Sequence, residues 1–391
     1  MAASFNPAAW REKLTDELLN NVTAFWLKHS LDREHGGYFN CLDHDGSVYD
    51  TTKHMWLQSR MVWMYSRMYN QFGGESAWLD AARLGLEFIT KYGVTPEGRA
   101  YFSLTRQGRP VFIQRKLFSE CFYSMALDEY SRATGDERLA AEALLMFEKV
   151  VELADNPCLL GRPMLEGQPE VSSMAVPMML LCCADQLSVG RENFPYSKRM
   201  NGWVEQVMSH IDPQRKIVLE NVAPGGGALP GSEGRLMNPG HAIEAGWFVL
   251  EYAKAHGQQQ YVGRALQMIE WSFERGWDKE HGGIYYFLDA ENRPPVQLEW
   301  QMKLWWPHCE SLYGMLLAWK VSGNEKFLEY FERTWDYIDT HLIDRESGEW
   351  FGYLDRQGQK THQLKGGPYK CFFHVPRTLM FCAKLLEELE G

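Results

Sequence analysis

The chain has 391 residues with a formal net charge of −11, and 45% of its residues are hydrophobic. A chain of this length can bury a large core, and its length alone allows two or three domains. The acidic balance argues against a nucleic-acid binder or an anionic-membrane binder, because both need a basic face. The 15 Trp, 18 Tyr and 20 Phe either fill a core or line a site that stacks on ring-shaped ligands.

Neither a signal peptide nor a membrane span is expected. Residues 1–10 contain no basic segment followed by an apolar one, and the longest apolar run, near 175–184, is about half as long as a span requires. Eight cysteines occur without a C-x-x-C pair, several of them in apolar stretches. We therefore expect free thiols in a reducing cytoplasm, although an even number also permits disulfides.

Apolar residues recur at three- and four-residue spacing in about twelve stretches, which predicts helices. A long connection separates the two helices of most pairs, and a short one leads to the next pair. The predicted pairs are 7–30 with 53–73, 75–92 with 112–134, 136–154 with 170–189, 193–211 with 239–257, 260–276 with 299–321, and 324–342 with 369–390.

A sequence repeat lies in the long connections. Segments 31–43, 277–289 and 343–355 align without gaps, a weaker copy covers 211–220, and a related stretch covers 98–108. Each copy predicts a turn, an alternating aromatic strand and another turn, hence a short hairpin. The copies that start at 211, 277 and 343 are 66 residues apart, which is close to one sixth of the chain.

Six helix pairs of equal length predict an all-α fold, an (α/α)6 barrel or toroid with short β-hairpins in the long connections on one face. A pair cannot bury its apolar face alone, so stacking and closure supply the core. An open superhelix is the alternative, but its ends would need polar capping repeats, and the sequence has none. We expect one domain over residues 1–391, with a pocket on the face where the inner helices begin.

Ionisable and aromatic residues gather where the second helices of the pairs begin. Buried charges need partners or a use, so such a set predicts a functional site better than any single residue does. Three-residue spacing puts His241 with Glu244, and His374 with Arg377, on shared helix faces. The set comprises Trp56, Arg60, Glu120, Asn238, His241, Glu244, Trp300, Lys303, Trp306, His308, Glu310, His374 and Arg377.

Three kinds of chemistry suit this set to different degrees. Histidines and carboxylates are metal ligands, but the spacing matches no metal-site signature, so we predict no metal. A glycosidase needs two facing carboxylates, whereas histidines dominate here. Two histidines on separate helices suit proton transfer at neutral pH, and Arg60, Arg377 and Lys303 are candidates to stabilise an enolate oxygen. The residues thus favour proton abstraction beside a carbonyl of a carbohydrate.

The same segments resemble the N-acylglucosamine 2-epimerase family, whose animal members are also called renin-binding protein. The resemblance runs in order through essentially the whole chain. Its motifs include Trp56-Leu-Gln-Ser-Arg60, Phe118-Ser-Glu-Cys-Phe122, Asn238-Pro-Gly-His-Ala-Ile-Glu-Ala-Gly-Trp247, Gln297-Leu-Glu-Trp300 and Lys365-Gly-Gly-Pro-Tyr-Lys-Cys-Phe-Phe-His-Val-Pro-Arg377. It implies an (α/α)6 barrel that interconverts N-acetylglucosamine and N-acetylmannosamine by ring opening and inversion at C2.

The resemblance also implies roles for particular residues. His241 and His374 become the acid/base pair, and Arg60, Glu310 and Arg377 match positions that the family needs for activity. It implies a homodimer and no consumed cofactor, with ATP or another nucleotide as an allosteric activator. The connection 156–167 has one basic residue where some relatives carry several lysines.

We assign substrate binding to seven other members of the set: Trp56, Glu120, Asn238, Glu244, Trp300, Lys303 and Trp306. Two other functions stay open at this point. One is an aldose–ketose isomerase, or a 2-epimerase of unmodified sugars, on the same scaffold. The other is a non-catalytic inhibitor of the renin-binding type, for which the pocket histidines would be dispensable.

Overall fold

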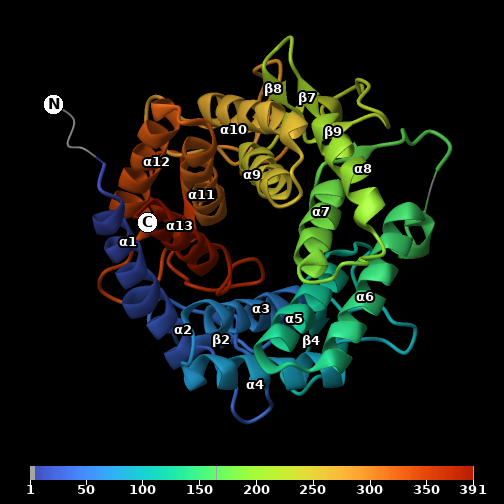
Figure 1. The fold of residues 1–391 in the computed structure, drawn as a ribbon, viewed down its shortest axis with the longest axis vertical. Coiled ribbons are helices and arrows are strands. Elements are labelled where there is room, and N and C mark those ends of the chain that lie inside the picture. The colour runs from blue at the N-terminus through green and yellow to red at the C-terminus, as the bar shows by residue number, and fades with distance from the viewer. Residues whose placement is uncertain (1–4, 164, 391) are drawn as a thin grey trace.

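The computed structural model describes residues 5–163 and 165–390, in which helices form a ring around a central axis (Figure 1). A π-helical segment, Glu17–Thr23, joins the first two helices, and another, Ile338–Leu342, extends the twelfth. The helices are α1 (Pro7–Asp16), α2 (Ala24–His29), α3 (Met55–Phe72), α4 (Ser76–Tyr92), α5 (Phe118–Thr134), α6 (Glu137–Asp155), α7 (Ala175–Ser188), α8 (Ser197–Met208), α9 (Pro239–Ala255), α10 (Val262–Gly276), α11 (Trp305–Ser322), α12 (Glu325–Tyr337) and α13 (His374–Glu390).

Two concentric layers make up the ring. The inner helices α3, α5, α7, α9, α11 and α13 contact one another in this order, and α13 contacts α3. Each outer helix packs against an inner one: α1 on α13, α4 on α3, α6 on α5, α8 on α7, α10 on α9 and α12 on α11. The predicted (α/α)6 toroid of six helix pairs is confirmed, and the ring is closed rather than an open superhelix.

The burial patterns of the two layers explain their positions. The outer helix α12 buries one stripe, formed by Phe327, Leu328, Phe331 and Trp335 among others, and exposes its other face. Inner helices such as α11 are buried around nearly their whole circumference, because helices or hairpins surround them. Such helices have little amphipathic pattern, so their length and neighbours identify them better than their periodicity does.

Four inner helices begin five or six residues later than predicted. These helices, α5, α7, α11 and α13, start at residues 118, 175, 305 and 374. The segments ahead of the first three contain short strands, β5 (Pro110–Phe112), β6 (Ser172–Ser173) and β12 (Lys303–Leu304), and turns precede α13. Their backbone groups bond to hairpins instead of to the helix, so an apolar run alone misplaced the start.

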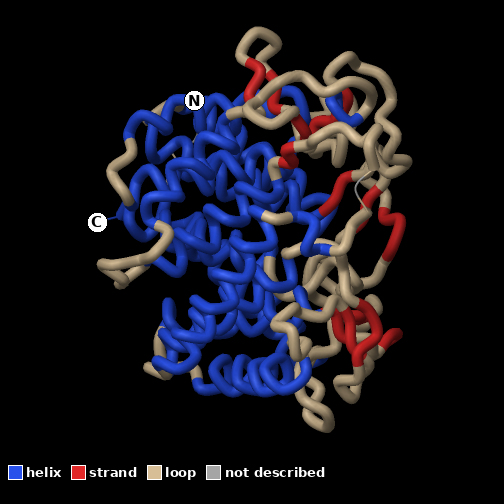
Figure 2. The backbone as a smooth tube through the Cα atoms, turned by 90° about the vertical axis from the view of Figure 1, so that its right-hand side faces the viewer, coloured by secondary structure: helices blue, strands red, loops and turns tan. Residues whose placement is uncertain are grey.

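The repeat segments form short antiparallel hairpins on one face of the ring, as predicted (Figure 2). Several strand pairs join different repeats and so tie neighbouring units together. The pairings are β1–β2, β3–β4–β5, β6–β9, β7–β8, β10–β11 and β12–β13–β14. The remaining strands are β1 (Cys41–Leu42), β2 (Val48–Asp50), β3 (Lys53–His54), β4 (Ser103–Leu104), β7 (Ile211–Asp212), β8 (Ile217–Val218), β9 (Asn221–Val222), β10 (Leu236–Met237), β11 (Leu288–Asp289), β13 (Tyr353–Leu354) and β14 (Lys360–His362).

Three buried ion pairs fasten the hairpins to the helices. In each one, the aspartate at the second position of a repeat accepts a hydrogen bond from a lysine on the segment that leads into an inner helix. All three lysine side chains are fully buried. The Nζ–Oδ2 distances are 2.9 Å for Lys53–Asp32, 3.2 Å for Lys303–Asp278 and 2.6 Å for Lys365–Asp344. We call these contacts the hairpin clamps.

The last repeat closes the ring against the N-terminal helices. Glu349 accepts hydrogen bonds from the Trp26 indole and, at 2.8 Å, from Lys370 Nζ. Trp350 Nε1 donates to Glu17 Oε1 at 2.7 Å. The two tryptophan contacts join residues more than 300 positions apart, so the two ends of the described chain hold each other in place.

None of the helices in the described part of the chain is long and apolar enough to cross a bilayer. All eight cysteines are free, as expected, and Cys158 is the exposed one. The cytoplasmic location stays a prediction, and residues 1–4, which belong to the segment searched for a signal peptide, lie outside the described residues.

Replacing Asp278 with Asn is expected to destabilise the fold by about 3–5 kcal/mol, because Lys303 would keep a buried charge without its partner. Burial raises the pKa of Asp278, but hydrogen bonds from Arg356 and Tyr285 and the charge of Lys303 outweigh this and leave it below its usual value. The clamp therefore stabilises the fold above about pH 3.8 and loses its effect as the pH falls through the lowered pKa.

Urea unfolding at pH 7 measures this loss. Asp80→Asn is the control, because Asp80 and its partner Arg83 are both mostly exposed, and exposed pairs contribute about 1 kcal/mol or less. Equal midpoints for the two variants would contradict a structural role for the clamp.

Candidate active site

A cavity of about 460 Å³ lies on the hairpin face, where the inner helices begin. Predicted site residues from α3, α9, α11 and α13 line it, which confirms that this face carries a pocket. Glu244, one turn into α9, is among them. The predicted residues that line it are Trp56, Arg60, His241, Glu244, Trp306 and His374.

His374, the first residue of α13, is set between a carboxylate and two guanidinium groups. Its Nδ1 lies 2.6 Å from Glu310 Oε1, and Arg60 Nη1 lies 3.4 Å from its Nε2. Burial, reinforced by the charges of Arg60 and Arg377, lowers the pKa of His374 well below its usual value. His374 is therefore neutral near pH 7, with Nδ1–H donating to Glu310 and a lone pair on Nε2.

Arg377 neutralises the carboxylates behind His374. Its Nη2 lies 2.9 Å from Glu244 Oε1 and 2.6 Å from Glu310 Oε1. Glu310 Oε2 also accepts a hydrogen bond from Trp247 Nε1 at 3.0 Å. Ligand atoms of Glu244, Glu310 and His374 lie within 4.8 Å of one another, a spacing that suits a metal ion. Here the Arg377 guanidinium already contacts both carboxylates and compensates part of their charge.

His241, in the first turn of α9, has a different partner. Its Nδ1 lies 3.0 Å from Glu220 Oε1 and 3.2 Å from Oε2, and its side chain is 29% exposed, against 10% for His374. Burial lowers the pKa of His241, but the Glu220 charge and hydrogen bond outweigh it, so the pKa lies above its usual value. The pKa values of the two histidines of the cavity are thus shifted in opposite directions.

Aromatic rings form the walls between these groups. The Trp306 ring centroid lies 5.1 Å from that of His241 and 6.1 Å from that of His374. Gly240 allows this placement, because a Cβ atom there would lie 2.6 Å from the Trp306 ring. The Arg60 guanidinium lies 4.5 Å from the centroid of Trp56, and burial lowers its pKa to about 10.

Four residues assigned to substrate binding do not line this cavity. Lys303 belongs to strand β12, and its Nζ is held in the clamp with Asp278. Trp300 lines a separate hollow beside Tyr285. The other two residues, Glu120 and Asn238, are held by neighbouring structure.

The Glu120 carboxylate is fully buried and accepts a hydrogen bond from Arg99 Nε at 2.6 Å. Asn238 caps α9, since its Oδ1 accepts the backbone N–H of His241 at 3.2 Å. Asn238 therefore acts on the site by fixing the first turn of α9. His308 is buried as well, with its Nε2 accepting the Ile284 N–H at 3.0 Å.

Several residues in or beside the cavity were not predicted from the sequence. Glu220 lies in the hairpin layer. Its position in the repeat could have pointed to it, because residues at the equivalent position of other copies also lie near inner-helix starts. The tenth residue of the four copies is Asn40, Glu220, Tyr286 or Gly352. Asn40 contacts His54, Glu220 contacts His241 and Tyr286 lines the cavity. The other unpredicted lining residues are Glu299, Met302, Leu304, Trp305, Tyr353 and Tyr369.

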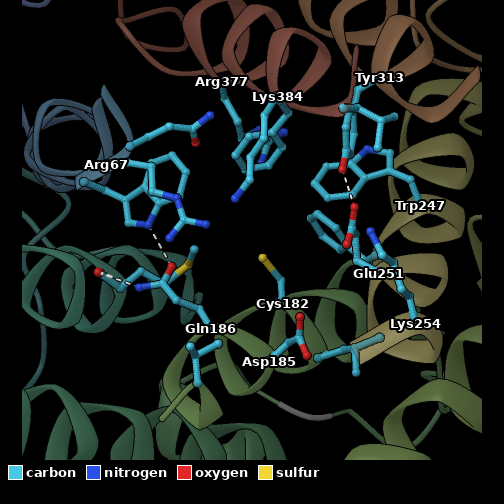
Figure 3. A pocket seen from close by; sticks show the side chains of 18 of the residues that line it. Arg67, Cys182, Asp185, Gln186, Trp247, Glu251, Lys254, Tyr313, Arg377 and Lys384 are labelled. Carbon is cyan, nitrogen blue, oxygen red and sulfur yellow. Dashed lines mark hydrogen bonds between the residues drawn. The ribbon is translucent and has the colours of Figure 1, made fainter. Parts of the chain in front are cut away.

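A second cavity, of about 350 Å³, lies at the other end of the ring lumen, and all six inner helices contribute to it (Figure 3). Arg377 and Trp247 line it, and both also hydrogen-bond to Glu310. A layer of side chains that includes Arg377 therefore separates this cavity from the one that His374 lines.

The first cavity can move protons on a bound molecule. It contains a neutral histidine, a histidine that favours its charged form, and a guanidinium next to the neutral one. A base, an acid and a cation of this kind suit abstraction of a proton beside a carbonyl, with the cation stabilising the enolate oxygen.

Comparison with known proteins agrees with this chemistry. The family pattern described as N-acylglucosamine 2-epimerase (GlcNAc 2-epimerase) matches residues 37–377. The N-acylglucosamine 2-epimerase of Homo sapiens is 44% identical over 97% of this chain and 91% of the human one. That of Bos taurus is 45% identical over 97% of this chain and 92% of its own.

Solved structures share the fold at lower identity. Cellobiose 2-epimerase from Bacillus thermoamylovorans B4167 superposes with a TM-score of 0.85 at 24% identity, covering 97% of this chain and all of the other. A D-mannose isomerase superposes with a TM-score of 0.79 at 16% identity, with both chains fully covered. The pattern match over most of the chain and the identity to curated relatives show that this chain belongs to the N-acylglucosamine 2-epimerase family.

Proposed function

We propose that this protein is a carbohydrate 2-epimerase that interconverts N-acetyl-D-glucosamine and N-acetyl-D-mannosamine. The observation that carries the proposal is the pair of histidines, His241 and His374, which line one cavity with opposite charge preferences. Family membership supplies the substrate class, since the related proteins of mammals carry the name of this activity.

The open-chain form of the sugar exposes an aldehyde beside C2. The neutral Nε2 of His374 takes the C2 proton, and the electron pair of the broken C–H bond forms a C1–C2 double bond while the carbonyl oxygen becomes anionic. Arg60, next to His374 Nε2, is placed to stabilise this oxygen. Protonated His241 then returns a proton to C2 from the other face, which restores the aldehyde with inverted configuration.

The other residues around His374 orient it. Glu310 accepts from Nδ1 and so fixes the tautomer that leaves Nε2 as the base. Arg377 pairs with Glu310 and favours its ionised form, whereas burial raises the pKa of this carboxyl. Trp56 and Trp306 offer flat apolar surfaces to the face of a sugar.

Three further assignments are part of this proposal. Activation by ATP or another nucleotide and assembly as a homodimer rest on family resemblance, and a cytoplasmic location rests on the free cysteines. The connection 156–167 offers one basic residue to a nucleotide, Arg162, whose Nε donates to the Arg115 carbonyl at 2.8 Å. Met164 of that connection lies outside the described residues.

Incubation with N-acetylmannosamine in D2O, with and without ATP, tests the activity. We expect N-acetylglucosamine that carries deuterium at C2, because the returned proton comes from a histidine in exchange with solvent. Parallel incubations with mannose and cellobiose test the two alternatives. Fructose from mannose, or a 2-epimer of cellobiose, without any conversion of the N-acetyl sugar would overturn the choice of substrate.

Replacing His374 with Asn should lower kcat by about 10²–10⁴-fold, because it removes a general base. His256→Asn is the matched control, since His256 also pairs with a carboxylate, Asp185 at 2.9 Å, away from the cavity. If both variants epimerised at the wild-type rate, the two-base mechanism would be wrong. If the wild type itself epimerised no sugar, a non-catalytic binding protein would become the better interpretation.

The pH profile of kcat/KM should be a bell with a broad top around neutral pH. Activity needs neutral His374, so it is lost when the pH falls through the lowered pKa of His374, below the usual value of about 6.5. It also needs protonated His241, so it is lost when the pH rises through the raised pKa of His241, above that value. A single acidic optimum below pH 6 would contradict this assignment.

A further inference from the structure

Glu220 is buried beside the cavity but does not line it, and its backbone is held from two sides. The residue lies between β8 and β9 in the hairpin layer. Its N–H donates to the Leu236 carbonyl at 2.8 Å, and its own carbonyl accepts the Met174 N–H at 3.0 Å. These bonds connect it to β10 and to the start of α7. The direction of the Glu220 side chain is therefore set by the fold.

The carboxylate of Glu220 serves His241. Both of its oxygens lie within 3.2 Å of His241 Nδ1, and no other hydrogen bond to this carboxylate occurs among the described residues. The side chain is 10% exposed, so water screens its charge only weakly. Because Glu220 holds the Nδ1–H of His241, the Nε2–H of this ring remains available to a molecule in the cavity that His241 lines.

The carboxylate behind His374 is in a different electrostatic state. Glu310 also contacts a histidine Nδ1, but Arg377 and Trp247 Nε1 donate to it as well. Arg60 adds a second guanidinium on the Nε2 side of His374. The Glu310 charge is thus compensated by arginine, whereas the side chain that hydrogen-bonds to the Glu220 carboxylate, among the residues that the structure describes, is a histidine.

The other charged groups around His241 reinforce this difference. Glu244 on its own helix and Glu310 on α11 both favour its charged form, and His374 on α13 is held neutral by its own surroundings. On the far side of Glu220, His210 is tied through Nδ1 to the Leu219 carbonyl at 2.9 Å, and burial lowers its pKa. Glu299 and Tyr286 line the cavity from the hairpin side and bring no positive charge.

We propose that Glu220 is a positioning residue that keeps His241 oriented and protonated, so that the resting enzyme takes the C2 proton with His374 and returns one from His241. This assignment of acid and base rests on the proposed function. Each turnover leaves His374 protonated and His241 neutral, so the two must exchange protons with solvent before the next molecule of the same epimer reacts.

The repeat shows that a carboxylate at this position is not required by the fold. Asn40 occupies the equivalent tenth position of the first copy, and its neutral amide contacts His54 Nδ1 at 3.2 Å. Glutamine at position 220 keeps the size and the hydrogen-bonding capacity of glutamate while removing its charge. Glu220→Gln thus separates the charge from the packing.

The test compares the pH profiles of kcat/KM for wild type, Glu220→Gln and Glu220→Asp. We expect the basic limb of Glu220→Gln to move to lower pH by about one unit or more, since an opposite charge at this distance shifts a pKa by about 1–3 units. The acidic limb should remain at its wild-type pH. In Glu220→Asp, the basic limb should lie between those of wild type and Glu220→Gln. At pH 9, kcat/KM of Glu220→Gln should fall by about 10-fold or more, which is one pH unit of lost protonation.

Asp185→Asn is the matched control. Asp185 Oδ1 lies 2.9 Å from His256 Nε2, a carboxylate–histidine contact away from the cavity, so its removal should leave both limbs in place. A uniform loss of activity in Glu220→Gln with an unchanged basic limb would overturn the proposal, because a purely structural role predicts that result.

A measurement without turnover distinguishes failure of this proposal from failure of the proposed function. In the full-length protein with ¹³C-labelled histidines, assigned with His241→Asn and His374→Asn, NMR titration follows each imidazole. His241 should titrate above the usual histidine range and His374 below it, and Glu220→Gln should lower the value of His241 alone. If no sugar is epimerised, this titration still decides the role of Glu220; equal values for the two histidines would refute it.

Discussion

The buried aspartate–lysine pair of the hairpin clamp is the contact on which the position of the site depends. Lys53 precedes α3, Lys303 precedes α11, and Lys365 lies on the segment that leads into α13, so each clamp fixes the approach to a helix that carries site residues. The desolvation cost of a buried charge makes other placements of the lysine unfavourable. The hairpins thereby define where Trp56, Trp306 and His374 stand, although they supply few of the reacting groups.

Much of the architecture follows from the repeat, because a unit of fixed length that cannot bury its own apolar face must stack on copies of itself. The starts of four inner helices could not be predicted from the repeat, because backbone hydrogen bonds to distant hairpins replace the first helical turn there. Within the site, His241, His374, Arg60 and Glu244 were predictable as ionisable residues in apolar runs. Lys303 fits the same description but neutralises an aspartate of the hairpin, and its sequence context does not distinguish the two roles.

Glu220 illustrates the opposite failure. A glutamate in a short strand is unremarkable in sequence, and its significance comes from a contact with a residue 21 positions later. The fold neighbours of this chain include an epimerase of a disaccharide and an isomerase of a hexose, so the scaffold does not determine the reaction. The site is distinguished by how the carboxylates beside its two imidazoles are compensated. Arginine pairs with the carboxylate behind His374, whereas His241 itself pairs with Glu220.

The layer that contains Arg377 has a consequence for solvent. The lumen of the ring is hollow at both ends, and side chains rather than backbone close it between the two cavities. Arg377 lines one cavity and bonds to Glu244, which lines the other. Its guanidinium thus separates the two cavities and also acts as a counterion. Shortening this one side chain would open a path for water from the far mouth to Glu310, and would hydrate the base from behind without altering any residue that a sugar touches.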